Sequence, residues 1–257
     1  MIGKLIDLYR NHQGLVSDKW SSYLPAYHKA FSSFTRKKIS LLEIGIQNGG
    51  SLEIWAKYFP RAELILGCDI NEECEKLTFE SPLISVVIGD ITKATTLHSI
   101  LAFSTSGFDI VIDDGSHFSQ DIINAFLLLF PNIKPGGIFI AEDLHCSYWR
   151  DFNGGISNAA SSMNFFKAIS DVINFEHWQT TCSRSEHMKS LFPMYDFSLI
   201  SEFELLLSSV HSIEFFNSMC FIRKSDEHIN CLGPRVITGR FETVCPVLEK
   251  DGTFIRE

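Results

Sequence analysis

The stretch SLLEIGIQNGGSLEIWAKYF (residues 40–59) runs from a strand-like pattern through a glycine-rich turn into a helix-like pattern. We expect a buried strand over 40–46 and a helix over 52–59. In an open α/β sheet, ligands bind beyond the carboxyl ends of the strands, where glycines let the backbone approach them closely. The turn is not G-x-G-x-x-G, because the paired glycines fall at 49 and 50. A pyrophosphate cradle, and with it a nicotinamide-dependent oxidoreductase, is therefore disfavoured.

Similar apolar runs that end in Gly or Asp recur along the chain between helical patterns, at 64–69, 85–89, 108–113 and 137–141. This alternation is typical of βαβ units and a parallel sheet. Two further runs, 211–216 and 219–224, flank Asn217-Ser218 and predict a tight hairpin. We therefore expect an α/β fold with a seven-stranded, mostly parallel sheet, an antiparallel C-terminal hairpin at its edge and helices on both faces.

With 257 residues and 45% hydrophobic content, the chain can bury the core of one large domain. We expect an N-terminal helical cap over 1–37, a catalytic core over 38–224 and a C-terminal tail over 225–257. Residues 150–200 are rich in Ser, Asn and aromatic residues and predict a lid inserted over a site. In the tail, VITGRF and PVLEKDGTF are strand-like.

Composition limits the partners and the compartment. The 31 acidic and 22 basic residues give a net charge of -9, which disfavours nucleic acid as a partner. The N-terminal residues lack the apolar core of a secretory signal, and no run reaches the roughly 18 apolar residues of a membrane span. Seven cysteines without C-x-x-C spacing indicate neither a disulfide framework nor a zinc site. We expect a cytoplasmic protein, and the sequence leaves a homo-oligomer open.

Acidic residues follow the second and third strands. A carboxylate at Asp69 could accept both hydrogen bonds of a ribose diol, and Asp90 could hold an adenine amine. Either Asp alone could equally be a solvated or helix-capping residue. Together with Glu43 on the first strand, the pattern over three successive strands favours a nucleoside ligand.

The stretch FDIVIDDGSH (108–117) places Asp113, Asp114 and His117 at the mouth of the fourth strand, and the fifth strand ends in Glu142-Asp143. Three or four carboxylates that converge there would bind a hard cation such as Mg²⁺ and leave positions for water and substrate. Helix capping is the plainer interpretation of Asp114 and Asp143. An iron triad of Asp114, His117 and His145 is a further alternative, which the Glu-Asp pair disfavours.

Two resemblances add to these patterns. The E-x-G-x-x-x-G-G turn followed by an acidic end to strand two resembles class I S-adenosylmethionine-dependent methyltransferases over residues 38–224. IDDGSH followed by PGGIFIAEDLHCSYW resembles the metal-dependent sugar O-methyltransferases of the macrocin and mycinamicin type, and SDKWSSYLPAYHKAF resembles the segment that precedes their first strand. The expected fold is therefore the Rossmann-like class I methyltransferase fold.

The resemblance implies a role for each candidate site residue. It implies that S-adenosyl-L-methionine is bound by Glu43, Gly45, Gly49, Ser51, Asp69, Asp90 and Asp113. It also implies that Asp114, Glu142 and Asp143 hold Mg²⁺ and that His117 is the general base, a role that suits the pKa range of histidine.

The implied activity is an S-adenosylmethionine- and Mg²⁺-dependent O-methylation of a sugar hydroxyl in bacterial polysaccharide or natural-product biosynthesis. The acceptor would be a small sugar or glycoside, and Tyr148, Trp149 and Phe152 could stack on its apolar face. Two alternatives stay open. One is a catechol-type metal-dependent O-methyltransferase, which would need a narrow apolar slot for the acceptor, and the other is a catalytically inactive S-adenosylmethionine-binding module.

Overall fold

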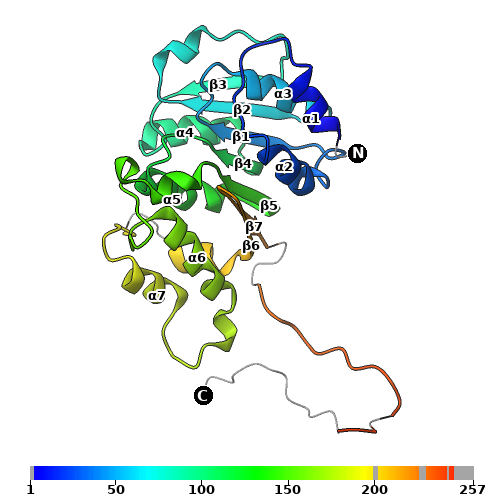
Figure 1. The fold of residues 1–257 in the computed structure, drawn as a ribbon, viewed down its shortest axis with the longest axis vertical. Coiled ribbons are helices and arrows are strands. Elements are labelled where there is room, and N and C mark those ends of the chain that lie inside the picture. Colours follow the sequence, from blue (N-terminus) through cyan, green and yellow to red (C-terminus); the bar gives the residue numbers. More distant parts are fainter. Residues whose placement is uncertain (1–2, 199–201, 226–229, 242, 246–257) are drawn as a thin grey trace.

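A computed structural model describes residues 3–198, 202–225, 230–241 and 243–245. Its centre is a seven-stranded sheet in the order β3-β2-β1-β4-β5-β7-β6 (Figure 1). The strands are β1 (Ser40–Ile44), β2 (Leu64–Asp69), β3 (Ile84–Ile88), β4 (Phe108–Asp113), β5 (Ile133–Ala141), β6 (Val210–Phe216) and β7 (Met219–Lys224). β1 to β5 pair in parallel, whereas β7 pairs antiparallel with both β5 and β6. The predicted fold class is thereby confirmed, including the C-terminal hairpin.

The order of the strands determines where a ligand can bind. From β1 the chain first adds β2 and β3 on one side, and then returns to add β4 and β5 on the other. β1 and β4 are therefore neighbours, and the loops that leave their carboxyl ends diverge to opposite sides of the sheet. Such a switch point is where open α/β sheets bind ligands.

Helices cover both faces of the sheet. On one face, α1 (Gly3–Arg10), α2 (Tyr23–Phe31) and α3 (Gly50–Tyr58) pack around the fully buried Trp55. On the other face lie α4 (Ala94–Phe103), α5 (Ser119–Leu129), α6 (Ser162–Ile173) and α8 (Phe203–Ser208), with α7 (Arg184–Leu191) beyond them. Short 3-10 turns complete the elements: η1 (Glu72–Lys76), η2 (Phe130–Asn132), η3 (Leu144–Tyr148), η4 (Arg150–Phe152) and η5 (Phe175–His177).

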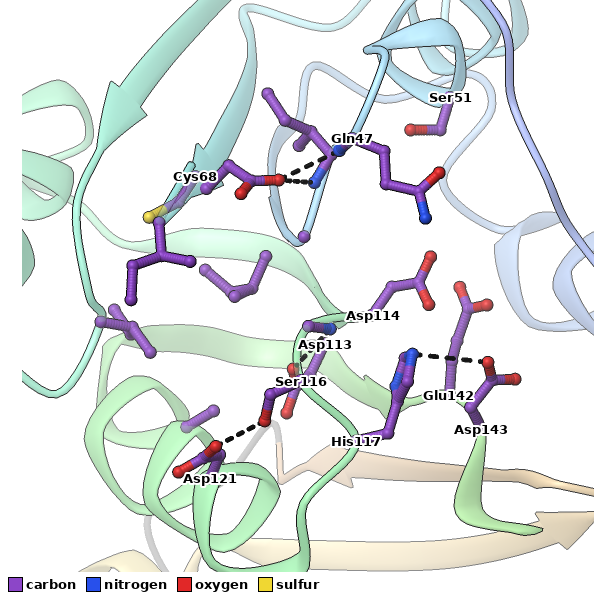
Figure 2. Close-up of a pocket in the computed structure, with 18 of the residues that line it drawn as sticks. Gln47, Ser51, Cys68, Asp113, Asp114, Ser116, His117, Asp121, Glu142 and Asp143 are labelled. Carbon is purple, nitrogen blue, oxygen red and sulfur yellow. Dashed lines mark hydrogen bonds and ion pairs between the residues drawn. The ribbon is translucent and has the colours of Figure 1, made fainter. Parts of the chain in front are cut away.

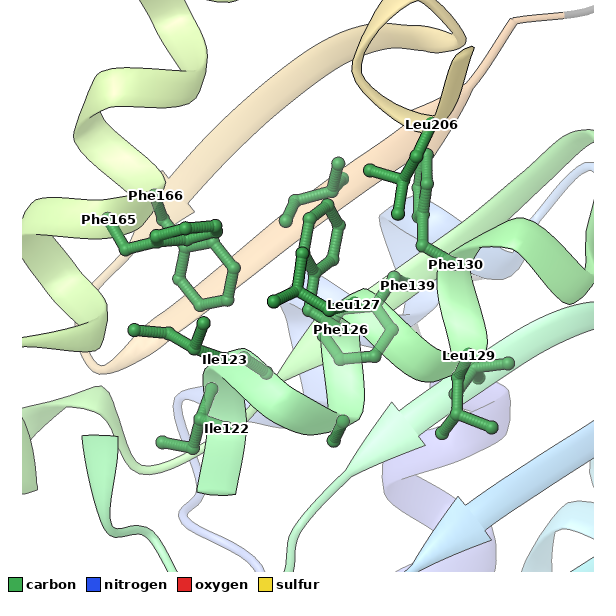
Figure 3. Packing of buried hydrophobic residues seen from close by; sticks show 14 of the residues in the cluster. Ile122, Ile123, Phe126, Leu127, Leu129, Phe130, Phe139, Phe165, Phe166 and Leu206 are labelled. Carbon is green, nitrogen blue, oxygen red and sulfur yellow. The ribbon is translucent and has the colours of Figure 1, made fainter. Parts of the chain in front are cut away.

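The structure corrects the expected lid. Within 150–200, α6 packs onto the sheet, because its Phe165 and Phe166 are fully buried against Phe126 of α5 (Figure 3). The other buried residues of α6, among them Ile169 and Val172, follow at helical spacing, which is the pattern of a helix that packs on a core. Phe152, near the start of the segment, comes close to the candidate site through a ring contact with His117.

The C-terminal tail also differs from the prediction where it can be compared. Residues 236–241, the VITGRF run, form no strand, and their side chains are exposed. The second strand-like run, at 246–254, lies outside the described residues. Among the helices of the described ranges, none has the length and apolarity needed to cross a membrane.

Candidate active site

A cavity of about 560 Å³ opens at the carboxyl ends of the parallel strands, over the switch point between β1 and β4. This volume is in the range of small-molecule and cofactor sites. Its walls come from the residues that follow β1, β2, β3, β4 and β5, and from an N-terminal segment before α2. The lining includes Val16 to Trp20, Ile44 to Gln47, Ser51, Cys68 to Ile70, Gly89 to Thr92, Asp113 to His117, Asp121, Ala125, Glu142 and Asp143.

The turn after β1 has a conformation that its glycine allows. Gly45 has φ +81°, and a Cβ there would lie 2.1 Å from the carbonyl oxygen of Asp114. Only glycine fits such an approach. Asp69 at the end of β2 fixes the same turn, because its Oδ2 accepts hydrogen bonds from the backbone nitrogens of Ile46 (2.9 Å) and Gln47 (3.0 Å). The floor of the cavity is therefore held in place by groups from two neighbouring strands.

Of the seven residues expected to bind the methyl donor, five line the cavity: Gly45, Ser51, Asp69, Asp90 and Asp113. Glu43 and Gly49 are not part of the lining. Gly49 has φ +79° and starts α3, so its role here is to turn the chain.

Glu43 is fully buried behind the cavity wall and is held entirely by protein groups. Its Oε2 accepts hydrogen bonds from Ser51 Oγ (2.7 Å) and Trp55 Nε1 (3.1 Å), and its Oε1 accepts one from Lys19 Nζ (3.2 Å). Glu43 therefore anchors the first turn of α3 and the N-terminal segment, rather than reaching a ligand in the cavity.

Two cavity aspartates have contrasting environments. Asp90 Oδ1 accepts hydrogen bonds from Thr92 Oγ1 (2.7 Å) and the Thr92 backbone nitrogen (2.8 Å), and the side-chain bond is the main cause that lowers the pKa of Asp90. Asp113 is buried, and its Oδ2 has no partner among the described residues. Burial raises the pKa of Asp113 to about 8. Among the described residues that line the cavity, Asp113 Oδ2 and Ser17 Oγ are buried polar atoms without a hydrogen-bond partner.

Lys19 lies among three carboxylates at one end of the cavity. Its Nζ is 2.5 Å from Asp114 Oδ2, 2.7 Å from Glu142 Oε1 and 3.2 Å from Glu43 Oε1, and its side chain is only 2% exposed. Burial alone would lower the pKa of Lys19, but these carboxylates raise it well above the ordinary value. Lys19 is therefore a permanent cation that compensates part of the buried acidic charge.

Two tyrosine hydroxyl groups of α2 also donate hydrogen bonds to carboxylates of this site. Tyr27 donates to Glu142 Oε1, and Tyr23 donates to Asp143 Oδ1 at 2.6 Å. Burial raises the pKa of Asp114 to about 6 and that of Glu142 to about 8. These two carboxyl groups therefore take up or release protons near neutral pH.

In each of the three carboxylates expected to bind a metal, one oxygen accepts a hydrogen bond from Lys19 or a tyrosine and the other oxygen accepts none from a described residue. Asp114 Oδ1 and Glu142 Oε2 accept no hydrogen bond from any described residue, and Asp143 Oδ2 faces only His117 Nε2, at 3.6 Å. Figure 2 shows the side chains of Asp114, Glu142, Asp143 and His117 gathered at one side of the pocket. Ligand atoms of Asp114, His117 and Asp143 lie within 4.8 Å of one another, as do those of Glu43, Asp114 and Glu142.

This donor set fits a hard divalent cation. Carboxylate oxygens are the ligands that Mg²⁺ prefers, and the free oxygens come from the ends of two adjacent strands. Lys19 already pairs with Glu43, Asp114 and Glu142. The cation would therefore be held on the side of the site where Asp143 and His117 lie. The engaged oxygens are oriented by hydrogen bonds from behind, an arrangement that commonly fixes metal ligands.

His117 and Asp143 both have a left-handed backbone, with φ +61° and +53°. Such conformations are unfavourable for residues other than glycine and cluster at functional sites. Burial lowers the pKa of His117. Its imidazole is therefore neutral around pH 7 and free to accept a proton.

Sequence analysis assigned no role to Lys19, Tyr23 or Tyr27, although the D-K and Y-x-x-x-Y spacing is visible in the segment 17–31. The four-residue spacing places both tyrosines on one face of α2, which faces the carboxylates. That pattern indicates a polar contact only once the position of α2 against the sheet is known.

The comparisons with known proteins agree with this geometry. Residues 42–144 match a family model described as a methyltransferase domain. An 8-demethyl-8-alpha-L-rhamnosyl tetracenomycin-C 2'-O-methyltransferase of Streptomyces olivaceus is 35% identical over 178 residues, which cover 65% of this chain and 46% of that protein. Demethylmacrocin O-methyltransferase of Streptomyces fradiae is 33% identical over 183 residues, covering 66% of this chain and 45% of that protein. This chain thus spans less than half the length of these relatives.

Among solved structures, MycE methyltransferase from the mycinamycin biosynthetic pathway in complex with Mg and SAH superposes with a TM-score of 0.69. The match is 25% identical and covers 95% of this chain and 58% of that one. A second MycE structure, with Mg, SAH and mycinamycin VI, has the same TM-score at 24% identity, and covers 90% of this chain and 54% of that one. Residues 42–144 are therefore similar to a methyltransferase domain, the fold is that of MycE, and about two thirds of the chain is similar in sequence to sugar O-methyltransferases of the tetracenomycin and macrocin type.

Proposed function

We propose that this protein is an S-adenosylmethionine- and Mg²⁺-dependent O-methyltransferase that acts on a sugar hydroxyl. One observation carries the proposal: Asp114, Glu142, Asp143 and His117 converge at one end of a cavity whose other walls are the Gly45 turn and the ends of β2 and β3. A nucleoside-sized space beside a carboxylate cluster is what a metal-assisted methyl transfer requires.

In the donor half, Asp69 and Asp90 are the proposed contacts of the ribose diol and the adenine amine. The position of Asp69 supports this role, because the residue lines the cavity and its carboxylate accepts a hydrogen bond from the turn that follows Gly45. The buried Asp113 Oδ2, which lacks a partner among the described residues, is a further acceptor for a donor group. The relatives described as MycE hold SAH, the demethylated product of such a donor.

In the acceptor half, the free oxygens of Asp114, Glu142 and Asp143 would hold the cation. A bound Mg²⁺ would supply Lewis acidity, which lowers the pKa of a sugar hydroxyl. The neutral imidazole of His117 would accept the hydroxyl proton. The hydroxyl oxygen then forms a bond to the methyl carbon, while the carbon–sulfur bond breaks and its electron pair stays on sulfur. The rigid carboxylate cluster would contribute by positioning the hydroxyl for in-line attack.

The surroundings support a small acceptor. The net charge of -9 disfavours nucleic acid, and the relatives are described by sugar-bearing substrates, among them an L-rhamnosyl compound. We infer a small glycoside as the acceptor and the cytoplasm as the place of reaction. Association of identical chains remains compatible with the site.

Calorimetry tests the donor site directly. Wild-type protein should bind S-adenosylmethionine with micromolar affinity, and Asp69→Ala should weaken binding at least tenfold in the presence and absence of Mg²⁺. Asp109 supplies a matched control, because it pairs with Lys134 at the start of β4 and β5, away from the cavity. Asp109→Ala should leave donor affinity unchanged. Absence of donor binding by the wild-type protein under all conditions would refute the proposal.

A further inference from the structure

A continuous row of rings begins at the wall of the cavity and leads outward. Trp20 contacts His145 edge-on at a centroid distance of 6.0 Å, and His145 contacts Trp149 at 4.6 Å. Trp149 lies 6.0 Å from Phe152, whose ring lies 5.3 Å from Phe118. We call these five residues the aromatic ledge.

The ledge is open to solvent, unlike the aromatic clusters of the two cores. Trp20 is 59% exposed and Trp149 is 52% exposed, while Phe118 is also exposed. Exposed single apolar residues are ordinary, but a contiguous group of large rings marks a binding surface.

The backbone under the ledge is rigid. Between Asp143 and Gly154 the chain is closed by consecutive backbone hydrogen bonds, including Trp149 N to Cys146 O (2.9 Å) and Gly154 N to Trp149 O (2.8 Å). Ser147 is buried and its Oγ lies 2.7 Å from Ser162 Oγ of α6. The rings are thus held exposed by a preorganised scaffold, which reduces the entropy lost when a ligand is bound.

The ledge adjoins the acidic end of the cavity. Trp20 itself lines the cavity, His145 Nδ1 lies 3.9 Å from Asp143 Oδ1, and the Phe152 ring lies 6.5 Å from that of His117. A molecule that presents one hydroxyl to Asp143 and His117 would therefore extend its remaining atoms over Trp20, Trp149 and Phe152.

We propose that the aromatic ledge is the acceptor subsite and that it binds the pyranose ring of a glycoside by its C–H face. The inference rests on the proposed methyl transfer and adds where and how the acceptor is held. Trp149 and Trp20 supply apolar faces for the ring carbons, while the sugar hydroxyls on the opposite face stay hydrated. A catechol would instead need a narrow apolar slot, and the ledge is an open surface.

The test measures acceptor binding in a complex that cannot turn over. Methyl α-L-rhamnopyranoside is titrated by NMR into the protein saturated with S-adenosylhomocysteine and Mg²⁺. Trp149→Ala and Trp20→Ala should each raise the dissociation constant of the rhamnoside about tenfold. Trp149→Phe, which keeps an aromatic face, should raise it less than about threefold.

Phe103 gives the matched control, because it is 49% exposed, ends α4 and is not among the residues that line the cavity. Phe103→Ala should leave rhamnoside binding unchanged, and Trp149→Ala, Trp149→Phe and Phe103→Ala should bind S-adenosylhomocysteine within about twofold of wild type. Wild-type protein that binds S-adenosylhomocysteine but no rhamnoside would overturn the ledge proposal, as would unchanged binding by Trp149→Ala. Catechol binding that depends on Trp149, or self-association that Trp149→Ala abolishes, would assign the ledge to another occupant. Failure of the wild-type protein to bind S-adenosylhomocysteine would instead refute the methyltransferase proposal itself.

Discussion

Replacing Lys19 by Met should destabilise the protein strongly, although it removes only one charge. The side chain is 2% exposed, and its Nζ contacts Glu43, Asp114 and Glu142 at 3.2, 2.5 and 2.7 Å. Met keeps an unbranched apolar stem and most of the volume of the side chain, but lacks the terminal ammonium group. The variant therefore leaves three converging carboxylates without their cation while changing the packing little.

The expected magnitude follows from burial and distance. At separations near 3 Å and an effective dielectric constant of about 20, each pair attracts by roughly 5–6 kcal/mol before desolvation is counted. Removal of one partner from a buried ion pair costs about 3–5 kcal/mol, since a buried charge is left uncompensated. Burial raises the pKa of Glu142, so this group can carry a proton in the variant and relieve part of the repulsion. We therefore expect a loss of about 3–5 kcal/mol in the free energy of unfolding, a large share of the stability of a typical domain.

Urea unfolding at pH 7 with a chelator present measures this loss. Lys29→Met is the control, because Lys29 pairs with Glu214 at the surface and is 65% exposed, so its removal should cost under about 0.5 kcal/mol. Adding Glu142→Gln to Lys19→Met should cost less than the two single changes together, with a coupling of about 1–3 kcal/mol. A loss below about 1 kcal/mol in Lys19→Met, or a coupling near zero, would refute the view that Lys19 compensates this cluster.

Three further outcomes are expected. Divalent cation affinity should rise between about pH 6 and pH 8, because the cation must displace protons from Asp114 and Glu142, whose pKa values are raised to about 6 and about 8. Calorimetry in buffers of different ionisation enthalpy would detect the released protons. A cation affinity that does not change with pH would contradict this prediction. Asp143→Asn should weaken Mg²⁺ binding at least about tenfold while donor affinity measured without Mg²⁺ stays the same; equal losses of both would point to general damage. Gly45→Ala should abolish donor binding and lower the free energy of unfolding by more than about 2 kcal/mol. The residue has φ +81°, and an added Cβ would lie 2.1 Å from the carbonyl oxygen of Asp114. A variant that melts at the wild-type temperature would show that the turn adapts.

The strands could be predicted from sequence because they are short apolar runs, of which β2 and β4 end in Asp. β2, β4 and β7 begin and end where the pattern places them, at 64–69, 108–113 and 219–224. β5 starts four residues earlier than predicted, at Ile133, because Pro135 and Gly136 continue the strand as an irregular stretch that pairs with β4 at Phe108. Within the segment expected as a lid, the amphipathic stretch at 160–175 forms α6, whose apolar residues pack in the core.

The site was predictable only in part, because two kinds of contact decide it. Carboxylates at strand ends meet wherever parallel strands are neighbours, so Asp114 and Glu142 follow from the sheet. The contacts that hold them come from Lys19 and Tyr27, which are 95 and 115 residues away in sequence. No periodicity links such positions. The partners of Glu43, Lys19 and Trp55, were likewise not visible in the sequence, since they come together only in three dimensions.

The segment from Leu15 to Trp20 explains how the two halves of the site depend on one another. It is fixed to the start of α3, where the backbone nitrogen of Gly50 donates to Val16 O at 3.2 Å. From this anchor two successive side chains diverge: Lys19 enters the carboxylate cluster, and Trp20 lines the cavity while joining the aromatic ledge. A shift of the segment by one residue would place either Asp18 or Trp20, instead of Lys19, against the three carboxylates and would leave their charge uncompensated. The Gly50 anchor therefore holds the donor turn, the acidic cluster and the proposed acceptor surface in one register.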